Sequence, residues 1–82
     1  MNTAGTMQWT TGTASEIKQS TGSYVFSLTP KDGSGRIDFY RTGTSHLTPG
    51  ENVRVKWDTA VVPPLGGRHE ALGVKPAEWP HP

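Results

Sequence analysis

The chain is predicted to be one small all-β domain in which short antiparallel strands close into a barrel. Short runs of alternating apolar and polar residues are separated by clusters of turn residues, and the 82 residues include 10 glycines and 7 prolines. Apolar residues do not recur at helical spacing over the length of an ordinary helix. The chain has no cysteine to form disulfides or thiolate zinc sites. A closed barrel stabilises such a chain because it leaves few free strand edges.

The expected strands are separated by turns whose residue types explain them. The five strands are residues 7–18, 23–29, 36–41, 52–59 and 70–74. Gly12 lies inside the first strand, where a glycine marks a bulge or a sharp bend. The strongest turn signal is at residues 30–35, because proline presets φ and an Asp-Gly pair tolerates positive φ. Residues 42–51 form a longer connection, with a single helical turn expected around residues 45–47.

The alternation assigns most large side chains to one face of their strand. Side chains expected in the core are Ile37, Phe39, Val53, Val55 and Trp57. Side chains expected on the outer face are Asp38, Tyr40, Arg54, Lys56 and Asp58. For Tyr24 and Phe26 two interpretations stay open, because Val25 and Ser27 alone would make a thin core. The two rings either fill the core or lie outside, about 7 Å apart, where bases could stack on them.

Five strands with a longer connection between the third and fourth follow the order of an OB-type barrel. An SH3-like barrel also has about five short strands and remains an alternative. The domain is expected to span residues 1–76, with a Pro-rich tail at residues 77–82. Trp79 in that tail is expected to fold back over an apolar patch. Trp9 is expected to pack at one end of the barrel, or alternatively to extend a binding surface.

Six short motifs follow one another between residues 12 and 76. They are Gly12-Thr13-Ala14, Gly22-Ser23-Tyr24-Val25-Phe26, Lys31-Asp32-Gly33-Ser34-Gly35, Ile37-Asp38-Phe39-Tyr40, Pro49-Gly50-Glu51-Asn52-Val53 and Ala71-Leu72-Gly73-Val74. Each motif is common on its own, but their order and spacing resemble those of the bacterial cold-shock domain. That family is an OB-fold barrel that binds single-stranded RNA or DNA. The resemblance implies the same barrel and a nucleic-acid-binding face.

The chain departs from the family at residues that matter for binding. Glu16 stands where the family has an exposed Trp, and Ser15 stands where the family has a basic residue. In the third strand Asp38 replaces an exposed Phe, and Tyr40 replaces an exposed His. A carboxylate on a phosphate-tracking surface repels its ligand. The family's binding face is therefore only partly matched.

Two functions follow from these residues. In the first, the chain binds single-stranded RNA or DNA with little sequence preference. Tyr24, Phe26 and Tyr40 would stack bases, while Lys18, Arg41, Arg54 and Lys56 would neutralise phosphates. In the second, the barrel is a protein-interaction module, which contacts a partner through a strand edge, the loop at residues 62–67 or the tail, or forms a homodimer. Exposed Tyr24 and Phe26 rings favour nucleic acid, and buried rings favour the interaction module.

Other classes of function find little support. Eight Lys and Arg against seven Asp and Glu give a formal charge of +1, unlike a dedicated duplex-DNA binder. No apolar run reaches the ~18–20 residues of a membrane span, and residues 1–5 lack a signal-peptide pattern. The cytoplasm is therefore the expected location. His46, His69 and His81 lack zinc-ligand spacing, and adjacent Ser45 and His46 side chains diverge. We expect no enzyme activity, no metal and no cofactor.

Overall fold

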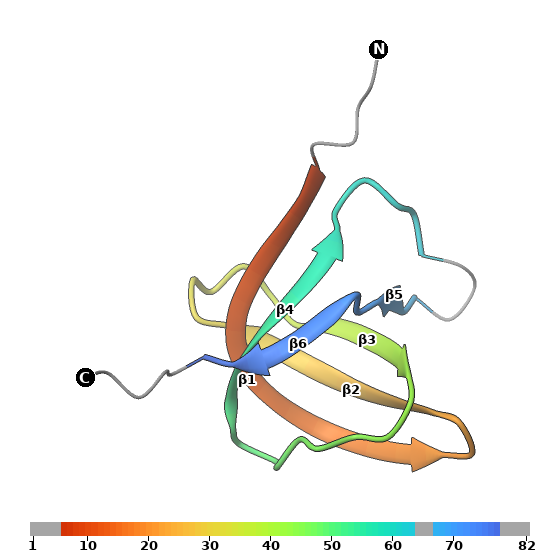
Figure 1. Ribbon diagram of the computed structural model, residues 1–82. Helices are drawn as coiled ribbons and strands as arrows, with labels where there is room; N and C mark the ends of the chain where they lie inside the picture. Colours follow the sequence, from red (N-terminus) through yellow and green to blue (C-terminus); the bar gives the residue numbers. More distant parts are fainter. Residues whose placement is uncertain (1–5, 64–66, 78–82) are drawn as a thin grey trace.

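The computed structural model describes residues 6–63 and 67–77, which contain six strands and no helix (Figure 1). The strands are β1 (Met7–Ser20), β2 (Ser23–Pro30), β3 (Ile37–Thr42), β4 (Asn52–Asp58), β5 (His69–Glu70) and β6 (Gly73–Pro76). They form one curled sheet in the order β5-β3-β2-β1-β4-β6. The β3–β5 pair is parallel, and the other four pairs are antiparallel. The all-β prediction is confirmed.

Strand β1 is long and curved because it belongs to two ladders (Figure 1). Its first half pairs with β4 and its second half with β2, and Gly12 and Thr13 have partners on both sides. A Cβ on Gly12 would lie 2.3 Å from the carbonyl oxygen of Thr29, so only glycine allows this close approach. Of the two alternatives expected at Gly12, a bulge or a sharp bend, the bulge is wrong, because Gly12 pairs in register on both sides. The register shift lies between Ser15 and Lys18, where Glu16 has a φ of 51°.

The expected fifth strand is split into β5 and β6. Ala71 and Leu72 interrupt it where the chain passes from one edge of the sheet to the other. The Ala71 N–H donates to the carbonyl of Tyr40 in β3 at 2.9 Å, and the Leu72 N–H donates to that of Lys56 in β4 at 2.7 Å. Residues 69–76 therefore link the two edges of the curled sheet. The sheet has six strands and not five, because one straight strand cannot pair with both β3 and β4.

A column of aromatic rings fills the core along the barrel. The ring centroids of Tyr24 and Phe26 lie 5.9 Å apart, those of Phe26 and Phe39 5.5 Å, and those of Phe39 and Trp57 5.5 Å. Leucine, valine and alanine side chains pack around the column; they are Ala14, Leu28, Val53, Val55 and Ala71. The core positions predicted for Phe39, Val53, Val55 and Trp57 are confirmed, and Ile37 packs against this cluster as a partly buried side chain. The buried indole N–H of Trp57 donates to the hydroxyl of Thr10 at 2.8 Å.

The connection between β3 and β4 is an open loop, and the helical turn expected at residues 45–47 is absent. Two side-chain hydrogen bonds explain the difference. The Ser45 N–H donates to the side-chain carbonyl of Gln19 at 2.7 Å, and the Leu47 N–H donates to the Ser45 hydroxyl at 3.1 Å. These bonds satisfy the backbone without a helix. The end of the barrel beneath this loop is therefore not covered by a helix.

The last strand ends two residues beyond the expected residue 74. Pro76 ends β6, and the Ala77 N–H donates to the carbonyl of Asn52 at 3.0 Å. The sheet thus extends to the beginning of the expected tail, and Trp79 lies outside the described residues. The part of the chain that is described contains no helix long and apolar enough to cross a membrane.

Candidate nucleic-acid interface

The rings of Tyr24 and Phe26 lie in the core and not on a binding surface. Tyr24 is 4% exposed and Phe26 is 0% exposed. Burial raises the pKa of the Tyr24 hydroxyl, and the neighbouring Arg41 guanidinium opposes that shift. The stacking site predicted for these two rings is therefore wrong, because large rings fill a small barrel better than Val25 and Ser27 do. This is the outcome that favours the interaction-module hypothesis for this face.

Tyr40 lies on the outer face of β3, as predicted, but apart from Tyr24 and Phe26. Its neighbour across the β2–β3 ladder is Val25, and Lys18 is the next residue along this row. On its other side Tyr40 pairs with Glu70 of β5. The Tyr40 side chain is only half-buried. It is a single partly exposed ring between an apolar residue and a carboxylate.

The two carboxylates that break the family pattern share one cation. Arg36 donates to Glu16 at 3.1 Å and to Asp38 at 2.9 Å, so it bridges β1 and β3 across β2. The hydroxyl of the buried Ser27 donates to Asp38 at 2.8 Å. The hydrogen bonds from Arg36 and Ser27 hold the pKa of Asp38 below its usual range. We call Glu16, Ser27, Arg36 and Asp38 the ion-paired face. Its cation, Arg36, is already paired with the two carboxylates of the same face.

The outer surface of β1, β4 and β6 has different chemistry. Trp9 is 40% exposed, and its ring edge lies over β6, where a Cβ on Gly73 would come within 3.2 Å of Cη2. The ring centroid is 5.1 Å from Lys75 Nζ and 5.6 Å from Arg54 Cζ. Lys56 pairs with Trp9 in the ladder. An exposed aromatic ring thus lies among three cations, and we call Trp9, Arg54, Lys56 and Lys75 the Trp9 face.

Among the described residues, no carboxylate forms a salt bridge with the cations of the Trp9 face. Within residues 6–63 and 67–77, all salt bridges involve Arg36. Arg54 Nε is buried and has no hydrogen-bond partner there. Their charges are consequently available to an anionic ligand, although the whole chain has a formal charge of only +1. Cation–π contact with Trp9 holds the guanidinium of Arg54 and the ammonium of Lys75 beside the ring.

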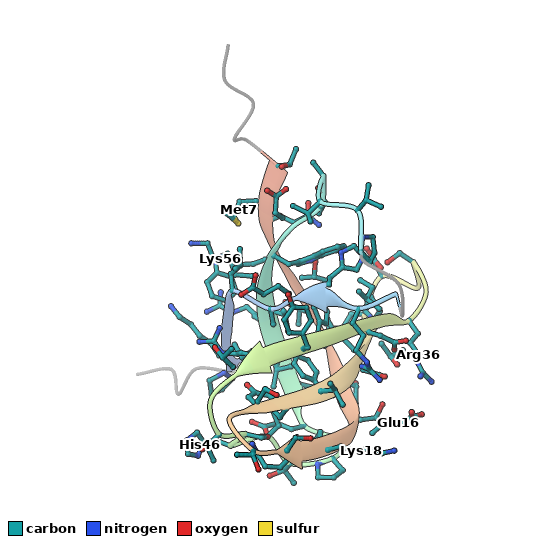
Figure 2. All side chains as sticks on the ribbon, turned by 90° about the vertical axis from the view of Figure 1, so that its right-hand side faces the viewer. Met7, Glu16, Lys18, Arg36, His46 and Lys56 are labelled. Carbon is teal, nitrogen blue, oxygen red and sulfur yellow. The ribbon has the colours of Figure 1, made fainter. Side chains whose placement is uncertain are left out.

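The structure separates the cations predicted to track phosphates. Arg54 and Lys56 lie together on the Trp9 face, whereas Lys18 lies on the side of the ion-paired face. Figure 2 shows Lys56 on one side of the molecule and Glu16, Lys18 and Arg36 on the other. Arg41 lies at the end of the barrel, where its Nη1 donates to the carbonyl of Ala71 at 2.8 Å. Two of the four predicted cations are therefore brought together.

Trp9 and Lys75 complete this site and were missing from the predicted set. The signal for Lys75 was its alternation with Val74, which places it outward in the last strand. The signal for Trp9 was its position in β1, opposite in parity to Gly12 and Ala14. Neither signal shows that β1 and β6 flank β4. That neighbourhood depends on sheet order.

A pocket of about 320 Å³ opens at the end of the barrel beneath the loop at residues 43–51. Its lining residues are Tyr24, Arg41, Thr42, Thr44, His46, Leu47, Glu51, Val53, Val74, Lys75 and Pro76. Lys75 belongs both to this pocket and to the Trp9 face. The two features are therefore continuous.

Neither a metal centre nor a known relative identifies the chain. In the part that the structure describes, no three His, Cys, Asp or Glu side chains are grouped so that they could hold a metal ion. Comparison with protein-family models, curated proteins and solved structures finds no match. The function is therefore inferred from the chemistry of the chain itself.

Proposed function

We propose that this protein binds single-stranded RNA or DNA on the Trp9 face, with little sequence preference. The observation that carries the proposal is one exposed tryptophan among three cations that form no salt bridge with a described carboxylate. Bases stack on aromatic rings, and Lys and Arg neutralise the phosphates of the same strand. Burial of Tyr24 and Phe26 removes the predicted binding face, but Trp9 supplies an aromatic ring on the other side of the barrel.

We further propose that the scaffold is a cold-shock-like barrel of the OB type. If β5 and β6 are counted as one interrupted strand, the sheet has five strands. The interrupted strand then pairs in parallel with β3 and antiparallel with β4, while β1 pairs with both β2 and β4. This closed order supports the OB type, a five-stranded partly open barrel.

A single strand suits this face better than a duplex. In a duplex the bases are stacked on one another, so a ring lying on a sheet reaches only the backbone. In a single strand each base can leave its neighbours and stack on Trp9, which contributes about 1–3 kcal/mol. Every base has a π-face, so such stacking discriminates little between sequences. Three cations make the affinity moderate and dependent on salt.

The test is the affinity of end-labelled oligo-dT and oligo-U, measured by fluorescence anisotropy at low salt. Trp9→Ala is expected to weaken binding by roughly five-fold to 150-fold, the loss of one stacked base. Tyr40→Ala removes a ring from the other side of the barrel and serves as the matched control. Absence of binding in the high-micromolar range, or equal effects of the two substitutions, would contradict the proposal.

A protein-interaction module is the second candidate, and exposed apolar side chains favour it in addition to the burial of Tyr24 and Phe26. Val61 is 55% exposed, Val62 84% and Leu72 40%. Val61 and Leu72 also line a hollow of about 150 Å³ beside His69. Adjacent exposed apolar side chains are typical of protein-docking surfaces. If copies of the chain meet there, light scattering gives a mass of two chains that Val62→Asp reduces to one; a single-chain mass for the unchanged protein excludes the homodimer.

A further inference from the structure

The pocket at the open end of the barrel has the size of a small-molecule site. Its volume of about 320 Å³ lies at the lower end of the roughly 300–1,000 Å³ found for ligand pockets. It exists because the loop at residues 43–51 passes over the end of the aromatic column without forming a helix. The pocket is therefore a consequence of how this chain connects β3 to β4.

The pocket has an apolar part and a polar part. Leu47 and Val74 pack against the core from the loop and from β6, and Val53 belongs to the core itself. Arg41, Lys75 and the threonines of residues 42 and 44 supply polar groups around them. A ligand that satisfies both parts carries a flat or apolar group and an anionic group.

The charges of the pocket favour an anion. Arg41 donates to the carbonyl of Ala71 at 2.8 Å and makes no salt bridge to a described carboxylate. Among the described lining residues Glu51 is the one carboxylate, and it already accepts the Thr48 N–H at 2.9 Å. The described lining therefore contains two cations, Arg41 and Lys75, and one carboxylate, which is already hydrogen-bonded to the loop. Arg and Lys are the side chains that bind phosphate oxygens.

Lys75 connects this pocket to the Trp9 face. Its Nζ lies 5.1 Å from the centroid of the Trp9 ring, and the same residue lines the pocket. We infer that the pocket holds one nucleotide of the bound strand, with its phosphate on Arg41 and Lys75 and its base against Leu47, Val53 and Val74. This inference rests on the proposed function. The preceding base then stacks on Trp9, and Lys75 contacts the phosphate between the two.

The experiment is a titration of the full chain with UMP, AMP and inorganic phosphate, followed by methyl NMR. UMP and AMP are expected to shift the methyl signals of Leu47, Val53 and Val74. Arg41→Gln is expected to weaken this binding by about tenfold, because a hydrogen bond to a charged group is lost. Lys18→Gln changes a cation on the other side of the barrel, outside both the pocket and the Trp9 face, and is expected to leave mononucleotide binding unchanged.

A steric variant keeps the test valid if Arg41→Gln perturbs the fold. Thr44→Phe places a ring at the rim of the pocket from an exposed loop position, and Thr21→Phe places the same ring in the exposed turn after β1. Thr44→Phe is expected to abolish mononucleotide binding and to weaken oligo-U binding, whereas Thr21→Phe is expected to do neither. Equal behaviour of the two variants would overturn the pocket assignment.

The remaining outcomes separate this inference from the proposed function. If oligo-U binds but the mononucleotides shift no methyl signal, the assignment of a nucleotide to the pocket is overturned, and binding on the Trp9 face stands. Equal affinity for phosphate and for UMP would reduce the pocket to a plain anion site and overturn the nucleotide assignment. Mononucleotide binding without oligo-U binding would contradict the proposed function and keep the pocket as a nucleotide site. If removal of residues 78–82 shifts the same methyls and no nucleotide binds, the end of the chain occupies the pocket, and the inference fails.

Discussion

The two outer faces of this barrel both carry cationic side chains but differ in what surrounds them. On the ion-paired face, Arg36 forms salt bridges with both Glu16 and Asp38, and Asp38 also accepts a hydrogen bond from Ser27. On the Trp9 face, three cations surround an exposed ring and no described carboxylate neutralises them. The first face is satisfied by its own side chains. The second has cations that no described carboxylate neutralises, so their charges are available to an external anion.

This difference shows why the overall charge of a chain is a poor guide to its ligands. A formal charge of +1 is nearly neutral, yet Glu16 and Asp38 are paired with Arg36, whereas no described carboxylate forms a salt bridge with the cations of the Trp9 face. Local potential, not net charge, attracts an anionic strand. The comparison between the two faces can be tested by substitutions that affect both, one or neither of them.

The largest effect is expected from Gly12→Ala, because β1 is shared by both faces. The new Cβ would lie 2.3 Å from the Thr29 carbonyl oxygen, so the β1 and β2 backbones must move apart. We expect the free energy of unfolding to fall by about 3 kcal/mol, the upper part of the range for overpacking. Urea denaturation measures this value.

Gly73→Ala is the matched control for that substitution. There the new Cβ would lie 3.2 Å from Trp9 Cη2, the tip of a partly exposed side chain that can shift. We expect a loss below about 1 kcal/mol. Equal losses at the two glycines would show that the contact between the β1 and β2 backbones is not the constraint that the structure indicates.

The next largest effect is expected from removing the charges of the Trp9 face. Each phosphate contact contributes about 0.7 to the slope of log K against log salt for a single strand. The triple substitution of Arg54, Lys56 and Lys75 by Gln is therefore expected to reduce the slope by about 2. Lys18→Gln, on the other side of the barrel, is expected to leave the slope unchanged. A fall of similar size with Lys18→Gln would remove the distinction between the faces.

The positions of the strands and of the core residues were largely predictable from the sequence. Which side chains lie on the outer faces was predictable only in part. Alternation predicted that Val53, Val55 and Trp57 point inward, because a strand with polar residues at every second position has only one apolar side. It could not decide for Tyr24 and Phe26, since the opposite side of β2 carries Val25 and Ser27, which are small enough to lie on either face. Ser27 is in fact buried, and its hydroxyl is satisfied by Asp38.

The site itself was predictable only in part, because its residues come from distant parts of the chain. Arg54 and Lys56 share a face by alternation alone. Trp9 reaches Gly73 only because β1 and β6 lie on the two sides of β4. Similarly, no local pattern shows that Arg36 bridges Glu16 and Asp38, since the bridge depends on the register of three strands.

A smaller effect is expected from Gly73→Val, which changes the Trp9 face without changing any charge. The added side chain lies under the edge of the Trp9 ring and displaces the ring from its place beside Lys75. We expect binding of oligo-U to weaken by about fivefold, the lower limit for one stacked base, with the salt slope unchanged. In a Trp9→Ala background the same substitution is expected to have no effect. An equal effect in both backgrounds would show that Gly73 acts on binding independently of Trp9.

The smallest effect concerns acid stability on the ion-paired face. Arg36, and then Ser27, lower the pKa of Asp38 in the folded protein. The unfolded pKa of Asp is about 3.9, so the stabilisation is fully present above that value. It is lost as pH falls through the lower folded pKa, because a protonated Asp38 no longer attracts Arg36. Unfolding of wild type and Asp38→Asn, followed by urea denaturation from pH 6 down to pH 2, measures the difference.

The wild-type protein is expected to be the more stable of the two at pH 6, with the difference shrinking on acidification. The pKa values of Asp32 and Asp58 are also lowered, by hydrogen bonds from Ser34 and Thr6 respectively. Both carboxylates persist in the variant, so their share of the acid sensitivity cancels in the comparison. A difference that does not change with pH would mean that Asp38 is not held by Arg36. Asp38 would then be free to repel a strand, while Arg36 would keep its pair with Glu16, so the side chains of the ion-paired face would satisfy one another only in part.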